Sequence, residues 1–93
     1  MKELRESFDG EGEVRGYHFE CLFRDGYAYM YEVSMGDYIS HYEVFERREN
    51  RSYDCVSYPR SRSFGSWAFT YRSYDEAYAR FLELSSRVRS REE

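Results

Sequence analysis

The chain has 93 residues, of which 34% are charged, and a formal net charge of −4. This length is enough for one domain with one modest core. An aromatic content of 20% argues against a disordered chain, because disordered segments are poor in aromatic residues, and no apolar run approaches the ~20 residues that a membrane-spanning helix needs.

The first residues are rich in Glu, Gly and Asp, and we expect residues 1–12 to form a flexible acidic lead-in. A single α+β domain is predicted over residues 13–90, followed by a charged tail over residues 91–93. No signal-peptide pattern is visible at the start of the chain, so a cytoplasmic protein is expected. In that reducing compartment Cys21 and Cys55 are predicted to be buried thiols, with a disulfide between neighbouring strands as the alternative.

Large apolar residues alternate with polar ones along much of the chain, which is the pattern of β-strands with two different faces. Asp25-Gly26 predicts a type I′ hairpin turn, and Gly36-Asp37 has the glycine-first order of a type II′ turn. These two turns predict an antiparallel meander. The expected strands cover, in order, residues 13–24, 27–35, 38–47, 53–58 and 67–71.

The periodicity changes from that of a strand to that of a helix at Ser73. Ser73 is a good N-cap, and Glu76 completes the capping box Ser-Tyr-Asp-Glu. A helix ending near Arg89 is predicted. Its apolar stripe consists of Tyr74, Ala77, Tyr78, Phe81, Leu84, Ser85 and Val88.

These elements predict an α+β fold: an antiparallel β-meander of four to five strands with one C-terminal α-helix packed across one face. The helix can cover only that face, whereas the strands carry large residues on both. The second, tyrosine-rich face is therefore interpreted as a semi-exposed aromatic lattice, a dimer interface or a partner site. Tyrosines that simply stabilise the sheet through cross-strand pairs are the alternative.

The basic residues are nearly all arginine and gather late in the chain. Residues 1–46 hold eleven acids and four bases (−7), and residues 47–93 hold seven acids and ten bases (+3), which sum to −4. Arg binds carboxylate or phosphate with a planar fork of donors. The segment 47–64 is therefore the best candidate for a contact surface. The residues predicted to bind a partner are Tyr29, Tyr31, Tyr42, Arg48, Arg60 and Arg62.

The leading hypothesis is a small non-catalytic domain that binds another protein, one with an acidic surface, through these side chains. Single-stranded nucleic acid is the alternative, because arginines interleaved with aromatic rings suit phosphates and bases. The net negative charge argues against it. A homodimer with the aromatic face as its interface is the third hypothesis.

No motif singles out a catalytic or metal site. His18 and His41 have no partners at a recognised metal-ligand spacing. The chain has no Gly-x-Ser-x-Gly elbow and no phosphate-binding glycine loop. We therefore predict no enzymatic activity, no metal and no cofactor.

The last strand and helix, with Ser73-Tyr74-Asp75-Glu76-Ala77 and Phe81, resemble the end of several small meander-plus-helix domains, the WGR domain among them. The Trp-Gly-Arg motif of that domain is absent, so the resemblance implies no function. A short acidic domain of this kind is also similar in style to accessory proteins of phages and mobile elements.

Overall fold

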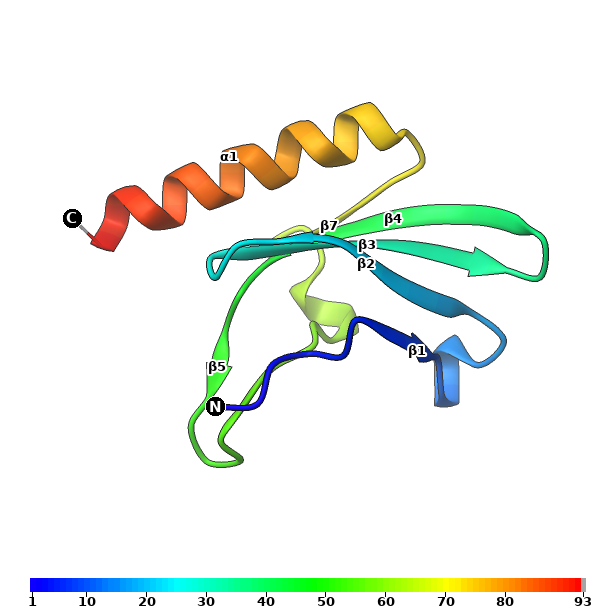
Figure 1. Cartoon of the computed structure of the whole chain (residues 1–93), viewed down its shortest axis with the longest axis horizontal. Coiled ribbons are helices and arrows are strands. Elements are labelled where there is room, and N and C mark those ends of the chain that lie inside the picture. The colour runs from blue at the N-terminus through cyan, green and yellow to red at the C-terminus, as the bar shows by residue number, and fades with distance from the viewer. Residues whose placement is uncertain (93) are drawn as a thin grey trace.

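One helix lies on a five-stranded antiparallel sheet in the computed structural model of this chain (Figure 1). The structure describes the backbone of residues 1–92 and the side chains of residues 1–87. The sheet order is β1-β2-β3-β4-β7, and β5 pairs with β6 in a separate ribbon. The predicted α+β class is confirmed. The elements are β1 Ser7–Asp9, η1 Gly12–Val14, β2 His18–Arg24, β3 Ala28–Met35, β4 Tyr38–Glu46, β5 Glu49–Asn50, β6 Cys55–Val56, η2 Ser61–Ser63, β7 Ala68–Tyr71 and α1 Tyr74–Glu92.

The central meander of β2, β3 and β4 follows the predicted order, but its first turn differs in type. Gly36 has the positive φ, 59°, that a glycine-first turn needs. A type I′ turn would need positive φ at both Asp25 and Gly26, and only Gly26 has it. Asp25 instead accepts hydrogen bonds at Oδ1 from the backbone N–H groups of Tyr27 and Ala28, at 3.0 and 3.2 Å. The carboxylate thus closes the connection.

Helix α1 begins where the capping pattern predicts. Ser73 Oγ accepts a hydrogen bond from the backbone N–H of Glu76 at 3.3 Å. The helix continues past the predicted end at Arg89 to Glu92, because no glycine or proline stops it. Residues 91 and 92, predicted as tail, are therefore helical, and residue 93 lies outside the described residues. The helix packs on a helix-side cluster of Ala28, Met30, Tyr42, Val44, Ala77, Phe81 and Leu84.

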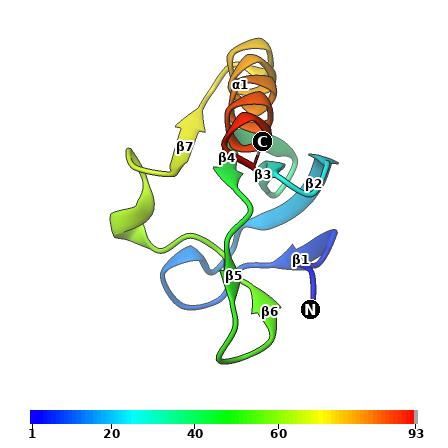
Figure 2. The same ribbon diagram turned by 90° about the vertical axis from the view of Figure 1, so that its left-hand side faces the viewer.

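The opposite face of the sheet is covered by the chain itself. Figure 2 shows β1, β5 and β6 on the side of the sheet away from α1. Residues 1–12 were expected to form a flexible lead-in, but residues 1–9, here called the N-terminal strap, contain β1, and η1 begins at Gly12. Apolar anchors at Leu4 and Phe8 hold the strap on the sheet. The strap-side cluster beneath consists of Phe19, Tyr29, Tyr31, Val33, Phe45, Val56 and Ala68.

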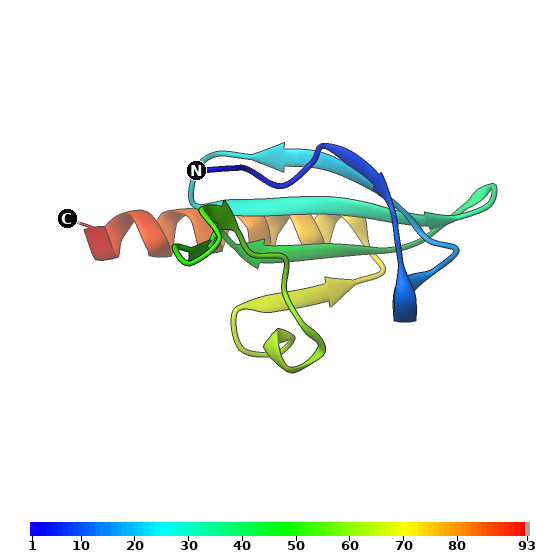
Figure 3. The same cartoon turned by 90° about the horizontal axis from the view of Figure 1, so that it is seen from below.

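The segment 47–64 forms the rest of this cover. Its predicted strand over residues 53–58 is reduced to β6, which pairs with β5. The parallel bridge between Lys2 and Cys55 ties the strap to this ribbon. Cys21 and Cys55 are both free thiols and only half-buried. Figure 3, seen from below, shows the chain crossing under the sheet and reaching η2, which lies outside β7.

Candidate interaction surface

The three tyrosines predicted to contact a partner lie in the interior. Tyr29 and Tyr31 are 1% and 0% exposed in the strap-side cluster, and Tyr42 is 7% exposed beneath α1. The expectation of an uncovered tyrosine face is therefore wrong. It counted α1 as the only cover, whereas the strap and the segment 47–64 cover the second face. Within the described part of the chain, the sheet face that motivated a homodimer is covered by the strap and by the segment 47–64.

The buried tyrosines form an aromatic lattice with their cross-strand neighbours. The Tyr31 and Phe45 rings stack with centroids 5.8 Å apart, and Tyr29 stacks on Phe45 at 5.5 Å. Phe8 of the strap stacks on Phe19 at 4.8 Å, and Tyr58 meets Phe45 edge-on at 5.5 Å. Such pairs add to the stability gained from burial alone. The cross-strand role of the tyrosines, the alternative stated from sequence, matches this geometry.

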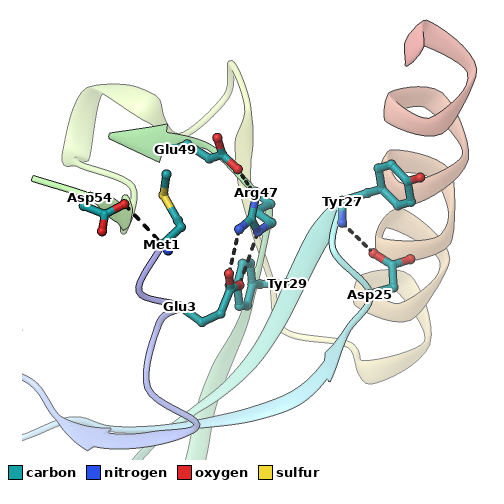
Figure 4. A network of polar contacts seen from close by, with 8 residues as sticks. All are labelled: Met1, Glu3, Asp25, Tyr27, Tyr29, Arg47, Glu49 and Asp54. Atoms are coloured by element: carbon teal, nitrogen blue, oxygen red, sulfur yellow. Dashed lines mark hydrogen bonds and ion pairs between the residues drawn. The ribbon is translucent and has the colours of Figure 1, made fainter. Parts of the chain in front are cut away.

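A polar clip joins the strap to the sheet beside this lattice (Figure 4). Tyr29 Oη donates to Glu3 Oε1 at 2.5 Å, while Arg47 donates to the same carboxylate from Nη2 at 2.6 Å and from Nε at 3.2 Å. Arg47 also binds Glu49 at 2.5 Å. The hydrogen bonds from Arg47, with a smaller contribution from the bond of Tyr29, lower the pKa of Glu3 to about 2. Burial, with a smaller contribution from the bond to Glu3, raises the pKa of Tyr29 to about 12.

A second polar chain lies under the segment 47–64. Tyr58 Oη donates a hydrogen bond to the buried carboxylate of Glu43. His41 Nε2 lies 3.2 Å from the other oxygen of Glu43, and Ser40 Oγ lies 2.9 Å from His41 Nδ1. Burial and the neighbouring Glu43 raise the pKa of Tyr58 well above its ordinary value. The chain of bonds satisfies a buried charge that would otherwise destabilise the fold.

The side chain of His18 links β1 to β2. Its Nδ1 lies 2.8 Å from Asp9 Oδ1, and its Nε2 lies 2.8 Å from Glu20 Oε1. The hydrogen bond to Glu20, with a smaller contribution from the bond to Asp9, raises the pKa of His18. Among the described residues no group of His, Cys, Asp and Glu has the arrangement of a metal site, and no pocket opens.

The predicted arginines, unlike the tyrosines, are on the surface. Arg48 places its guanidinium 5.0 Å from the centre of the Trp67 ring and binds Glu46 at 3.3 Å. Arg60 and Arg62 are exposed at the start and in the middle of η2. No carboxylate of the described residues lies within ion-pair distance of either. Arg48, Arg60, Arg62 and Trp67 are called the arginine surface below.

Two features next to this surface were not predicted from sequence. Arg80 of α1 stacks over Phe69 at 4.5 Å and donates to Tyr71 Oη at 2.7 Å. In addition, β7 is one of the two edge strands of the sheet, and its Thr70 is exposed. The alternation of Trp67, Phe69 and Tyr71 indicates a strand, but strand order depends on pairing between distant segments and is not visible in a local pattern.

A scan against known protein families found no match for this chain, and searches of curated proteins and of solved structures found none either. Within the described residues, no helix combines the length and the apolar character needed to cross a bilayer. The fold and the surface chemistry are therefore the basis for a functional proposal.

Proposed function

We propose that this chain is a small non-catalytic binding domain that holds an acidic segment of another protein on its arginine surface. The observation that carries the proposal is the state of Arg60 and Arg62, which are exposed and have no carboxylate partner in the described part of the chain. Arg24, Arg47 and Arg80, by contrast, each bind a carboxylate of the chain itself. An unpaired guanidinium fork is available for an external carboxylate.

The backbone that carries these arginines is held in place. Arg60 N–H donates to Ser63 Oγ at 3.2 Å, and the Ser63 N–H donates to the Arg60 carbonyl at 2.8 Å. The Trp67 N–H then bonds to the Ser63 carbonyl at 3.1 Å. A fixed backbone lowers the entropy lost when a partner binds. The Trp67 ring likewise fixes the direction of the Arg48 side chain.

The aromatic residues around these arginines favour a protein over single-stranded nucleic acid. Base stacking needs exposed rings. Tyr58 and Phe64 pack on the strap-side cluster, and Trp67 lies under Arg48. Tyr53 is 79% exposed but lies in the turn between β5 and β6. The surface thus offers guanidinium groups without a platform of free rings.

Binding of two labelled probes of matched charge tests this proposal: a short glutamate-rich peptide and a short oligothymidylate. We expect the peptide to bind, and the double variant Arg60→Ala/Arg62→Ala to weaken it about tenfold, or ~1.4 kcal/mol. Fluorescence anisotropy measures both affinities, and circular dichroism checks that the variant is folded.

The double variant Lys2→Ala/Arg15→Ala is the matched control, because it removes the same charge at two exposed positions away from η2. This control should keep the peptide affinity within about twofold of the wild-type value. Two charges removed far from η2 change only the long-range attraction, which salt screens. Equal loss in both double variants would show only general electrostatic attraction and would contradict the proposal. Tighter binding of the oligothymidylate, with an affinity that falls steeply between about 50 and about 200 mM salt, would favour the nucleic-acid alternative.

A further inference from the structure

The outer edge of β7 is an open edge of the sheet beside the arginine surface. β7 ends the sheet order, and β4 pairs with only one of its sides. The bond from the Glu46 N–H to the Trp67 carbonyl, at 3.0 Å, shows which residues of this strand face β4. Because backbone groups alternate in an antiparallel pair, Phe69 and Tyr71 also face β4, and Ala68 and Thr70 face outward.

The outward backbone groups of Ala68 and Thr70 differ in whether they have a hydrogen-bond partner. The carbonyl of Ala68 accepts a hydrogen bond from the Gly65 N–H at 2.7 Å, and Phe64 forms a parallel bridge with Ala68. The loop after η2 therefore closes the edge at its beginning. No hydrogen bond among the described residues uses the outward N–H or carbonyl of Thr70. The edge is open from Thr70 onward, towards Arg72.

Exposed arginines come before and after this open part of the edge in the chain. The contact between Gly65 and Ala68 places η2, with Arg60 and Arg62, on the outward side of β7. Arg72 directly follows β7 and is exposed, and it has no ion pair within the described residues. An edge flanked by arginines disfavours pairing with a second copy of itself, because like charges would face one another.

We propose that β7 accepts an extended acidic peptide as a sixth strand of the sheet, with the peptide backbone bonded to Thr70 and its carboxylates facing Arg60, Arg62 and Arg72. Strand addition of this kind obtains affinity from main-chain hydrogen bonds and specificity from alternate side chains. This inference rests on the proposed function and deepens it, because it gives the partner's conformation as well as its charge.

The test measures binding of a short labelled peptide that alternates Glu and Val, residues that suit an extended strand. Thr70→Pro removes the outward N–H and leaves the bonds from Phe69 and Tyr71 to β4 in place, since an edge strand tolerates proline on its open side. Thr70→Val is the matched control, because it keeps the N–H. We expect Thr70→Pro to weaken binding about tenfold and Thr70→Val to change it less than about twofold.

A second arm leaves the protein unchanged, in case Thr70→Pro fails to fold. The same peptide, N-methylated at every second residue, loses the donors on one side but keeps all its carboxylates. Two such peptides exist, one methylated at the odd positions and one at the even positions. We expect one of them to bind the wild-type protein about tenfold more weakly than the unmodified peptide, and the other to bind about as well. If both methylated peptides bind as tightly as the unmodified peptide, strand addition is wrong.

The outcomes separate this inference from the proposed function. If Arg60→Ala/Arg62→Ala weakens binding while Thr70→Pro and N-methylation do not, the arginines bind a peptide away from the edge, and strand addition is wrong. If the backbone changes weaken binding but the arginine variant does not, strand addition stands without the arginine surface. If the alternating peptide does not bind at all, the arginines near β7 serve only to keep the edge from aggregating, and the inference fails.

Discussion

Three tyrosines of the strap side combine a buried or half-buried ring with a hydroxyl that has a specific acceptor. Tyr29 donates to Glu3, and Tyr31 donates to the carbonyl of Arg5 at 2.6 Å. Tyr58 donates to Glu43. Two of these acceptors belong to the strap, so the hydroxyls connect the sheet to the segment that covers it. This explains why the chain uses Tyr where Phe would fill the same volume.

The bond between Tyr58 and Glu43 gives a prediction at this scale. Tyr58→Phe keeps the ring in the lattice but removes a donor from a buried carboxylate, which costs more than an exposed hydrogen bond. We expect a loss of about 1–3 kcal/mol in the free energy of unfolding, measured by urea denaturation. Tyr53→Phe removes a hydroxyl from a strongly exposed ring and is the control, with an expected change below about 0.5 kcal/mol. Equal midpoints for the two variants would show that the bond to Glu43 contributes little.

The elements divide into those that local sequence predicts and those that it does not. The central meander and α1 follow from alternation, from turn residues such as Gly36, and from the cap at Ser73, all of which act over a few residues. β1 has only three residues in an acidic segment, and its place is set by the register of Phe8 opposite Phe19. The cover by β5 and β6 likewise depends on contacts between distant segments. These long-range contacts are the part of the fold that local patterns miss.

The pairing of β1 with β2 should depend on pH through His18. The folded state raises the pKa of His18 from its ordinary value of 6.5, so protonation and folding favour each other. The resulting stability is fully present below pH 6.5 and is lost as the pH rises through the folded-state pKa. We expect amide hydrogen exchange in β1 to become faster, relative to β3, across that interval.

His18→Gln is the matched variant for this measurement, because it can still donate a hydrogen bond but does not titrate. His41 and the N-terminal amine are present in both proteins, so the comparison isolates the effect of His18. The relative protection of β1 in the variant should stay constant with pH. A wild-type β1 whose relative protection also stays constant would show that the ion pairs with Asp9 and Glu20 do not hold the strand.

At the scale of the whole molecule, the acidic and basic halves of the chain are joined by ion pairs. Glu3 binds Arg47, and Glu46 lies 3.7 Å from Arg87. The charge asymmetry visible in the sequence is thus partly neutralised inside the fold, and Arg60 and Arg62 are among the described arginines that form no ion pair. The sequence pattern was sufficient to place Arg48, Arg60 and Arg62 on the surface. It was insufficient for the buried tyrosines, because their exposure depends on what distant segments cover.

The strap also gives a prediction for the whole molecule, since it is the cover of one face. Deleting residues 1–9 removes the Phe8 ring from Phe19 and the Glu3 carboxylate from Arg47, and it uncovers the strap-side cluster. We expect a loss of at least about 3 kcal/mol in the free energy of unfolding, because the deletion removes the half-buried Phe8 and Leu4 side chains and also exposes the cluster beneath them. Urea denaturation measures this loss, while dye binding and light scattering report the exposed aromatic patch and the self-association that it promotes.

A point variant separates the loss of the aromatic cover from the effect of shortening the chain. Phe8→Ala keeps the length and the clip at Glu3 but removes the stacked ring, and it should produce a large part of the same destabilisation. Val14→Ala, at an exposed position of η1, should change stability by less than about 0.5 kcal/mol. A truncated protein that stays monomeric, binds no dye and unfolds at the wild-type midpoint would mean that the sheet does not need the strap.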